Sequence, residues 1–352
     1  ISIRGTFAVQ IGGLCMKYER WLIPETDDAA VDGAAGETTD DTAADCVDAV
    51  IRFEDVSFTS DPSEAKRKRK RPPAQRQADW GNSPDSIWAL SDVSFAVKSG
   101  EFLGIAGHTG SGKSTLVQHM NGILKPTHGR VMVRGLDMVD KRSEAELRGT
   151  VGVVFQYPEH QLFAETVYKD VAFGPRNLGL SGDEVEARVR ESLSRVGLSI
   201  DSLRDMSPFE LSGGQQRRVA FAGVLAMNPE ALVLDEPVAG LDPVARREFL
   251  ELIAQLHKQG TTIVMVSHSM DDLAAMCDRV VVLKEGEIVR QGTPAHVFMH
   301  AAKLNEIGLG LPAPQRMAYA LIDAGAPLSA DELYSIDSLA AEIASIAEGG
   351  AR

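Results

Sequence analysis

The segment GHTGSGKST, residues 107–115, constrains the fold of this chain more than any other stretch. Its glycines let the backbone curl so that N–H groups point inward, which suits a phosphate anion. Lys113 adds a cation, and Ser114 adds a hydroxyl at the start of a predicted helix. The apolar run EFLGIAG before the loop predicts a buried strand. Strand, loop and helix in this order predict a site for a polyphosphate with a magnesium ion.

The run ALVLDEP predicts a second buried strand that ends at two acidic residues, Asp235 and Glu236. Open α/β sheets bind their ligands at the carboxyl ends of the strands. Because adjacent carboxylates are costly to bury without a cation or a donor, we expect Asp235 to hold the magnesium ion and Glu236 to polarise an attacking water. The alternative is a solvated acidic pair between a strand and a loop.

A second anion site is predicted at LSGGQ, residues 211–215, where a glycine-rich segment precedes the helical pattern QRRVAFAGVLAM. Ser212 and the free N–H groups of such a helix start can bind an anion. Taken alone, Ser-Gly-Gly before a helix is equally compatible with a flexible N-cap. One γ-phosphate does not need two enclosing sites, so the second site requires an explanation.

Apolar runs alternate with helical patterns along much of the chain. Strands are predicted in VIRFEDVSF, LSDVSFAV, EFLGIAG, VGVVFQ, ALVLDEP and TTIVMVSH, with a hairpin in RVVVLKEGEIVRQG. Helices are predicted from Lys113, in DEVEARVRESLSRVG and in DPVARREFLELIAQLHKQG. This alternation indicates an α/β fold with a largely parallel sheet that is covered on both faces.

The ordered set GHTGSGKST, FQ, LSGGQ, LVLDEP, AGLD and SH resembles the ATP-binding subunit of an ABC transporter, over residues 50 to about 292. The resemblance implies an ABC-type P-loop nucleotide-binding domain, with a mixed-sheet core, a helical signature subdomain and a small C-terminal helical segment. In that family two subunits pack head to tail, and the signature of each completes the nucleotide site of the other. This arrangement would account for two anion sites in one chain.

The resemblance implies a role for each matching residue. Glu236 would be the catalytic base, His268 the switch histidine and Gln156 the Q-loop contact to magnesium and water. The magnesium ligands would be Ser114, Gln156 and Asp235. The residues implied to contact ATP, from the Walker A loop, the signature and the D-loop, are Gly107, His108, Thr109, Gly110, Ser111, Gly112, Lys113, Ser114, Thr115, Ser212, Gly213, Gly214, Gln215 and Asp242.

Two points in this assignment stay open. A histidine that follows an apolar strand is often a core residue with its hydrogen bonds satisfied, which is the alternative for His268. The family also stacks adenine on an aromatic residue just after the first strand, where this chain has Ser60. Phe58 and Trp88 are the candidates to replace that aromatic residue.

The segment FQYPEHQLFAETVYKDVAFGPRNLGL resembles the energy-coupling factor (ECF) ATPases of vitamin and metal-ion importers, specifically their second type. DMSPFELSGGQQRRVAFAGVLAMNPE and EIGLGLPAPQRMAYALIDAG share this resemblance. It implies a heterodimer with a first-type ATPase (a homodimer stays open), a transmembrane T component and a substrate-binding S component. We expect at least one of Phe163, Val167, Val171 and Phe173 to line a groove for the T component, ordinary packing being the alternative.

Composition restricts the partners and the location. The net charge of −14 over 352 residues disfavours nucleic acid. Three scattered cysteines, Cys15, Cys46 and Cys277, fit a reducing cytosol. No apolar run approaches the roughly 20 residues that span a bilayer, and the start, which lacks methionine, shows no signal-peptide cleavage site. Any membrane role would then come through a partner, and together with the resemblance this implies a protein bound peripherally to the cytoplasmic face of the cell membrane.

The expected domains are a disordered acidic extension (1–49), an ATP-binding domain (50–300) with a basic insertion (61–86), and a C-terminal helical segment (301–352). The basic run Lys66 to Arg71 is either a solvated loop or a contact to an anionic membrane. A capping-box pattern predicts a C-terminal helix with one apolar face, more often internal packing than a partner surface. The residues of this pattern are Ser329 and Glu332 for the cap, and Leu333, Ile336, Leu339, Ile343 and Ile346 for the face.

Three rival functions remain. A non-transport ABC ATPase of the chromosome kind has very long coiled coils between the Q-loop and the signature, where this chain has about 55 residues. The ATPase of another ABC importer class would lack the ECF-like segment. A regulatory module without turnover would not need Glu236 and His268.

Overall fold

The computed structural model describes residues 8–11, 14–17, 48–60, 88–140, 147, 149–299, 304, 308–329 and 333–349. The basic insertion 61–86, with its predicted solvent or membrane contacts, lies outside these residues, as does most of the acidic extension 1–49. Within that extension, strand β1 (Ala8–Ile11) pairs antiparallel with β2 (Leu14–Lys17), so these segments depart from the expected disorder. Both precede the acidic stretch on which that expectation rests.

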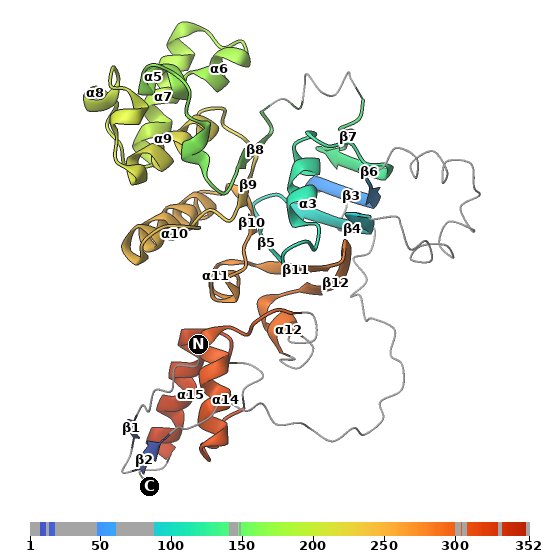
Figure 1. Ribbon diagram of the computed structural model, residues 1–352, viewed down its shortest axis with the longest axis vertical. Coiled ribbons are helices and arrows are strands. Elements are labelled where there is room, and N and C mark those ends of the chain that lie inside the picture. Colours follow the sequence, from blue (N-terminus) through green and yellow to red (C-terminus); the bar gives the residue numbers. More distant parts are fainter. Residues whose placement is uncertain are drawn as a thin grey trace, which may run out of the picture.

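A six-stranded sheet forms the centre of the molecule, in the order β12-β11-β5-β10-β9-β8 (Figure 1). All neighbouring strands in it are parallel except β12, which pairs antiparallel with β11 as the predicted hairpin. The prediction of a largely parallel sheet is therefore confirmed. Its strands are β5 (Phe102–Ala106), β8 (Val151–Val154), β9 (Ala231–Asp235), β10 (Thr262–Val266), β11 (Arg279–Lys284) and β12 (Glu287–Gly292).

A second sheet is wholly antiparallel, in the order β4-β3-β6-β7. Its strands are β3 (Ala49–Phe58), β4 (Leu90–Lys98), β6 (His128–Val133) and β7 (Leu136–Asp137). The first two predicted strands thus exist but belong to this sheet and not to the parallel one. Helix α3 (Lys113–Met120) shares one buried core with both sheets, through Leu116, with Val93 of β4 and Val264 of β10.

A lobe of helices lies beyond β8, at the edge of the central sheet (Figure 1). It contains α5 (Val167–Val171), α6 (Phe173–Asn177), α7 (Gly182–Arg195), α8 (Ile200–Leu203) and α9 (Gly213–Leu225), with 3₁₀ turns at Pro158–Gln161 and Pro208–Glu210. Helices α10 (Pro243–Lys258), α11 (Met270–Met276) and α12 (Pro294–Phe298) accompany the central sheet. The buried faces of α7, α9 and α10 form one apolar core with β5, β9 and β10.

Two helices end the described chain, α14 (Ala313–Asp323) and α15 (Ile336–Gly349), and they pack against each other (Figure 1). The predicted start of the last helix is wrong. Helix α15 begins at Ile336, after Ser335, whose hydroxyl accepts a hydrogen bond from Ser338 N (3.1 Å). Ser329 therefore does not cap it, and Glu332 lies outside the described residues.

The apolar face of α15 is correspondingly smaller than predicted. Leu339 and Ile343 pack against Ala318 of α14, together with Leu333, which precedes the helix. Ile336 is 76% exposed, because the helix starts only there and turns this side chain outward. Internal packing is thus the role of the buried part of the face. No helix within the described residues is both long and apolar enough to cross a bilayer.

Candidate functional site

The glycine-rich loop joins the end of β5 to the start of α3, as predicted. Gly112 immediately precedes the helix with φ +102, a left-handed conformation that L side chains rarely adopt. A Cβ atom at this position would lie 2.4 Å from the carbonyl oxygen of Ala89, so only glycine fits. Ser111 is completely buried, while most other residues of the loop face an open cavity.

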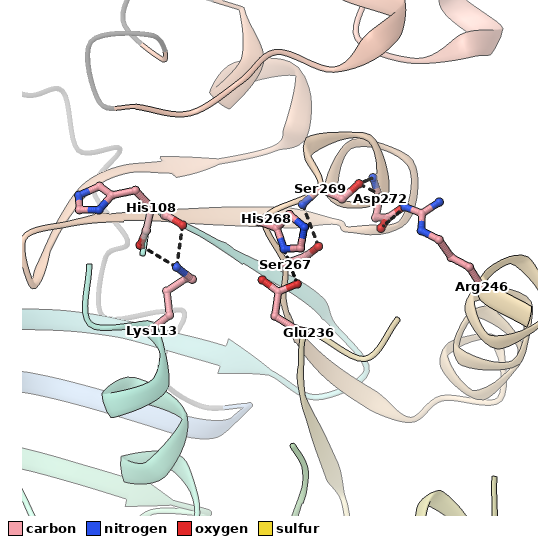
Figure 2. A network of polar contacts seen from close by, with 9 residues as sticks. His108, Lys113, Glu236, Arg246, Ser267, His268, Ser269 and Asp272 are labelled. Carbon is pink, nitrogen blue, oxygen red and sulfur yellow. Dashed lines mark hydrogen bonds and ion pairs between the residues drawn. The ribbon is translucent and has the colours of Figure 1, made fainter. Parts of the chain in front are cut away.

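Lys113 points back into this loop (Figure 2). Its Nζ atom donates hydrogen bonds to the carbonyl oxygens of Gly107 (2.6 Å) and His108 (2.8 Å). Burial lowers the pKa of Lys113, although the carboxylates of Glu236 and Asp235 oppose that shift. The loop therefore holds a partly desolvated cation beside two acidic side chains, an arrangement that favours an incoming polyanion.

Asp235 is the last residue of β9, and Glu236 follows it with φ +50. The Glu236 backbone N–H donates to Val266 O at 3.0 Å, which fixes this turn to the end of β10. Burial raises the pKa of Asp235, and the neighbouring Glu236 raises it further, whereas Lys113 opposes the shift. Two largely buried carboxylates near a single lysine leave a deficit of positive charge, which a divalent cation would offset.

His268 follows β10 and reaches the second of these carboxylates. Its Nδ1 atom lies 2.7 Å from an Oε2 atom of Glu236 (Figure 2). The imidazole side chain is 77% exposed, whereas that of Glu236 is 14% exposed. His268 is therefore not a buried core histidine, and the alternative raised by its position after an apolar strand is excluded.

The segment after His268 is fixed by an arginine that the sequence reasoning missed. Arg246 of α10 donates to both carboxylate oxygens of Asp272 in α11 (2.5 and 2.6 Å) and to the Ser269 hydroxyl (3.3 Å) (Figure 2). Both contacts come from one guanidinium nitrogen, Nη2, and Asp272 is buried, so this charge-assisted pair lies partly away from solvent. The pair anchors the helix that begins next to His268. No local pattern connects Arg246 to Asp272, because the two lie on different helices.

One cavity of about 700 Å³ brings these groups together. The sequence-predicted residues that line it are Gly107, His108, Thr109, Gly110, Gly112, Lys113, Ser114, Thr115, Gln156, Asp235, Glu236 and His268. Ala89 and the C-terminal segment Gly308–Leu309–Gly310, neither of which was predicted, complete the wall. Ser111 is absent from the lining because it is buried beneath the loop.

The signature residues 212–215 and Asp242 do not line this cavity. Ser212 caps α9: its N–H donates to Gln215 Oε1 (3.1 Å), and its hydroxyl accepts from Gln215 N (3.4 Å). Gly213 and Gly214 form the first turn. Asp242 caps α10, accepting from Val244 N (2.9 Å) and Ala245 N (3.1 Å). The predicted second anion site is therefore separate from the first within one chain.

The candidates for stacking adenine are engaged elsewhere. The Phe58 ring packs edge-on against His119, with 4.9 Å between centroids, and the Trp88 ring lies over His128 at 6.0 Å. Of the described residues, the cavity wall contains no Phe, Tyr or Trp. Neither candidate therefore offers its ring to the cavity.

The four apolar residues predicted near a partner groove separate into two pairs. Val167 and Val171 are fully buried in the core of the helical lobe, so for these two residues the alternative of ordinary packing is correct. Phe163 and Phe173 are 61% and 49% exposed, and their rings contact edge-to-face with 4.9 Å between centroids. Together they form an exposed apolar patch on this lobe, which we name the aromatic pair.

The cavity suits a magnesium ion that is bound together with phosphate. Its wall offers the Ser114 hydroxyl, the Gln156 amide and the Asp235 carboxylate, all of them oxygen donors of the kind Mg²⁺ prefers. Among the described residues, no three His, Cys, Asp or Glu side chains converge to hold a metal by themselves. The remaining ligands would then be phosphate oxygens and water, as is usual for Mg²⁺.

Comparison with known proteins agrees with this geometry. The ABC transporter family matches residues 90–239. The energy-coupling factor transporter ATP-binding protein EcfA2 of Symbiobacterium thermophilum is 54% identical over 260 residues, which cover 74% of this chain and 90% of that protein.

Two solved structures share the fold. CbiO1 from Clostridium perfringens, part of the ABC transporter complex cbiONQ, matches with a TM-score of 0.60 at 35% identity, over 78% of this chain and 99% of that one. The dimeric ATP-binding cassette MJ0796, bound to ADP and Pi, matches with a TM-score of 0.56 at 28% identity, over 69% of this chain and 98% of that one. The chain therefore belongs to the EcfA2 family of energy-coupling factor transporter ATP-binding proteins.

Proposed function

We propose that this chain binds ATP with magnesium in the cavity at the 107–115 loop, within an ATP-binding domain formed by residues 50–300. It is an ABC-type ATPase that hydrolyses ATP to power an energy-coupling factor transporter. The observation that supports this most directly is the convergence of Lys113, Gln156, Asp235, Glu236 and His268 on one cavity. These residues come from the start of α3, from the end of β9 and from the segments that follow β8, β9 and β10.

Each of these side chains has a distinct task in the proposed reaction. Lys113 would exchange its bonds to the loop carbonyls for bonds to the phosphates. Glu236 would polarise the attacking water, and the exposed imidazole of His268 would hold that carboxylate and contact the γ-phosphate. Ser114, Gln156 and Asp235 would hold the magnesium ion, which supplies positive charge to the phosphates when it is bound.

The site is completed by a second ATPase subunit in this proposal. The signature residues 212–215 lie outside the chain's own cavity, yet they present a glycine-rich helix start that can bind an anion. Packing two subunits head to tail would place each signature over the other subunit's cavity. The dimeric state of the MJ0796 cassette bound to ADP and Pi supports the pairing of two such subunits. Hydrolysis removes the γ-phosphate, which one subunit's cavity and the other subunit's signature both contact, so the dimer would reopen.

Membrane subunits would dock on the helical lobe. The aromatic pair is an exposed apolar patch, and such patches commonly mark partner sites. We propose that it receives a transmembrane T component at the cytoplasmic face of the membrane, and that a separate S component selects a vitamin or a metal ion. The presence of cbiO1 in the complex cbiONQ supports membrane partners of this kind.

Co-purification from membranes tests the proposed function. An affinity-tagged full-length chain, expressed in its native host, should bring down one second ATPase and a T-type membrane protein. That complex should hydrolyse ATP. The Glu236→Gln variant should purify with the same subunits and bind ATP, but turn over on the order of 10²–10⁴-fold more slowly. Recovery without any membrane protein, or near-normal hydrolysis by the variant, would contradict the proposal.

A further inference from the structure

A buried arginine, Arg217, connects the signature helix α9 to the loops of the chain's own cavity. Arg217 lies in the second turn of α9, the helix that begins at the signature residue Ser212. It is 2% exposed, although arginine is among the residues least often buried without a partner. Its guanidinium contacts two loops that serve the chain's own cavity.

The three contacts of Arg217 come from different parts of the sequence. Nη2 donates to the carbonyl oxygen of Gln156 at 2.7 Å, and Nη1 donates to that of Ala239 at 3.0 Å. Nε also forms an ion pair with Glu159 Oε2 at 3.2 Å, without the geometry of a hydrogen bond. Charge-assisted bonds of this kind are stronger than neutral ones, and buried ones hold geometry most firmly.

Both backbone partners belong to loops that carry groups of the cavity. Gln156 itself lines the cavity. The Ala239 N–H donates to Glu236 O at 3.1 Å, so Ala239 closes the turn that presents the catalytic carboxylate. The two loops also lie close together, since a Cβ atom built on Gly240 would lie 3.6 Å from the Tyr157 ring. Arg217 therefore fixes the Q-loop and the turn after Glu236 to the signature helix.

We propose that Arg217 is a positioning residue for ATP hydrolysis. It fixes the position of the chain's own cavity at the 107–115 loop relative to the signature residues 212–215, which complete the cavity of the partner subunit. It acts chiefly by holding the Gln156 backbone, so that the Gln156 side chain reaches magnesium and water when the dimer closes. This inference rests on the proposed function, because it presumes that residues 212–215 serve a second subunit.

Replacement of Arg217 in the purified transporter complex tests this role. Arg217→Met should lower kcat by roughly 10- to 100-fold, the scale expected for a displaced catalytic group, while KM for ATP changes less than about threefold. KM is spared because the loop 107–115 and Lys113 are untouched. Arg217→Lys keeps the charge but reaches fewer partners, so it should recover part of kcat.

Arg279, whose side chain is 17% exposed, provides a control for the loss of a largely buried arginine. Its guanidinium donates to Glu101 Oε1 (2.7 Å) and to the carbonyl oxygen of Ala96, so its partners have the same chemistry. It begins β11 beside Leu103, at the opposite end of the strands from the cavity. Arg279→Met should lower the melting temperature at least as much as Arg217→Met, yet leave kcat within about twofold.

A double-mutant cycle with Gln156→Ala separates positioning from a general loss of structure. If Arg217 acts through Gln156, Arg217→Met should lower kcat by less than about threefold in the Gln156→Ala background. An equal loss of kcat in both backgrounds, or an equal loss from Arg279→Met, would overturn the inference. Failure of the proposed function itself would look different, because the wild-type complex would then not hydrolyse ATP.

Discussion

The Nδ1 atom of His268 lies 2.7 Å from the Oε2 atom of Glu236, although 32 positions separate the two residues in sequence. Sheet register explains the contact. Strands β9 and β10 are parallel neighbours in which Asp235 is paired with Val266, so the residues that follow both strands emerge at the same edge. The register thus places a potential base beside an exposed imidazole at the mouth of the cavity, which leads to the first prediction.

Replacing His268 by alanine should lower kcat by roughly 10- to 10²-fold, because the Glu236 carboxylate loses its side-chain partner and the γ-phosphate loses a contact. Steady-state hydrolysis by the purified complex measures the effect. His257→Ala is the control, since His257 pairs with Asp278 and the Gly100 carbonyl away from the cavity. Equal activity of the two variants would exclude a role for His268.

Replacing Lys113 by methionine should weaken ATP binding by about 10²-fold, because it removes a partly desolvated cation that is ready to bind phosphate. The fold should persist, since the hydrogen bonds that this side chain makes with described residues all go to carbonyls of its own loop. Titration with a fluorescent ATP analogue measures affinity, and Lys169→Met, in an exposed pair with Glu165, is the control. Unchanged affinity would show that phosphate does not bind at this loop.

Replacing Asp235 by asparagine should raise the melting temperature of the nucleotide-free protein at pH 7 while abolishing hydrolysis. Burial and Glu236 raise the pKa of Asp235 above 3.8, so its ionised form is disfavoured in the folded protein. That destabilisation is fully present above the folded-state pKa, shrinks as the pH falls through that pKa, and is lost below 3.8, where the carboxyl is protonated in both the folded and the unfolded state. Thermal melts from pH 7 to pH 4 should therefore show a shrinking difference. A difference that is independent of pH would contradict this explanation.

Replacing both members of the aromatic pair, Phe163 and Phe173, by serine should reduce recovery of the membrane subunit at least about tenfold, because it removes a solvent-exposed apolar patch from the docking surface. ATP binding should be unchanged, as neither ring lines the cavity. Val289→Ser, at another exposed apolar position on β12, is the control. Full recovery of the membrane subunit would place the docking surface elsewhere.

Much of the site is foreseeable from the sequence, because strand ends can be recognised locally. The apolar run that ends at Asp235, and the one before His268, put polar residues at the carboxyl edge of the sheet. Local patterns did not distinguish the antiparallel sheet of β3 and β4 from the parallel one, since both kinds of strand have apolar residues. The contacts of Arg217 and Arg246, and the approach of Gly308 to the cavity, depend on how distant elements pack, which periodicity does not encode.

The most direct test concerns the claim that each molecule holds two incomplete halves of a nucleotide site. ATP turnover of the isolated chain is measured across a dilution series, and light scattering follows its association. Hydrolysis per molecule should fall to background where the chain is monomeric and return when the second ATPase is added, because Ser212 and Glu236 of one molecule do not share a cavity. Constant turnover per molecule down to the monomer would contradict the claim.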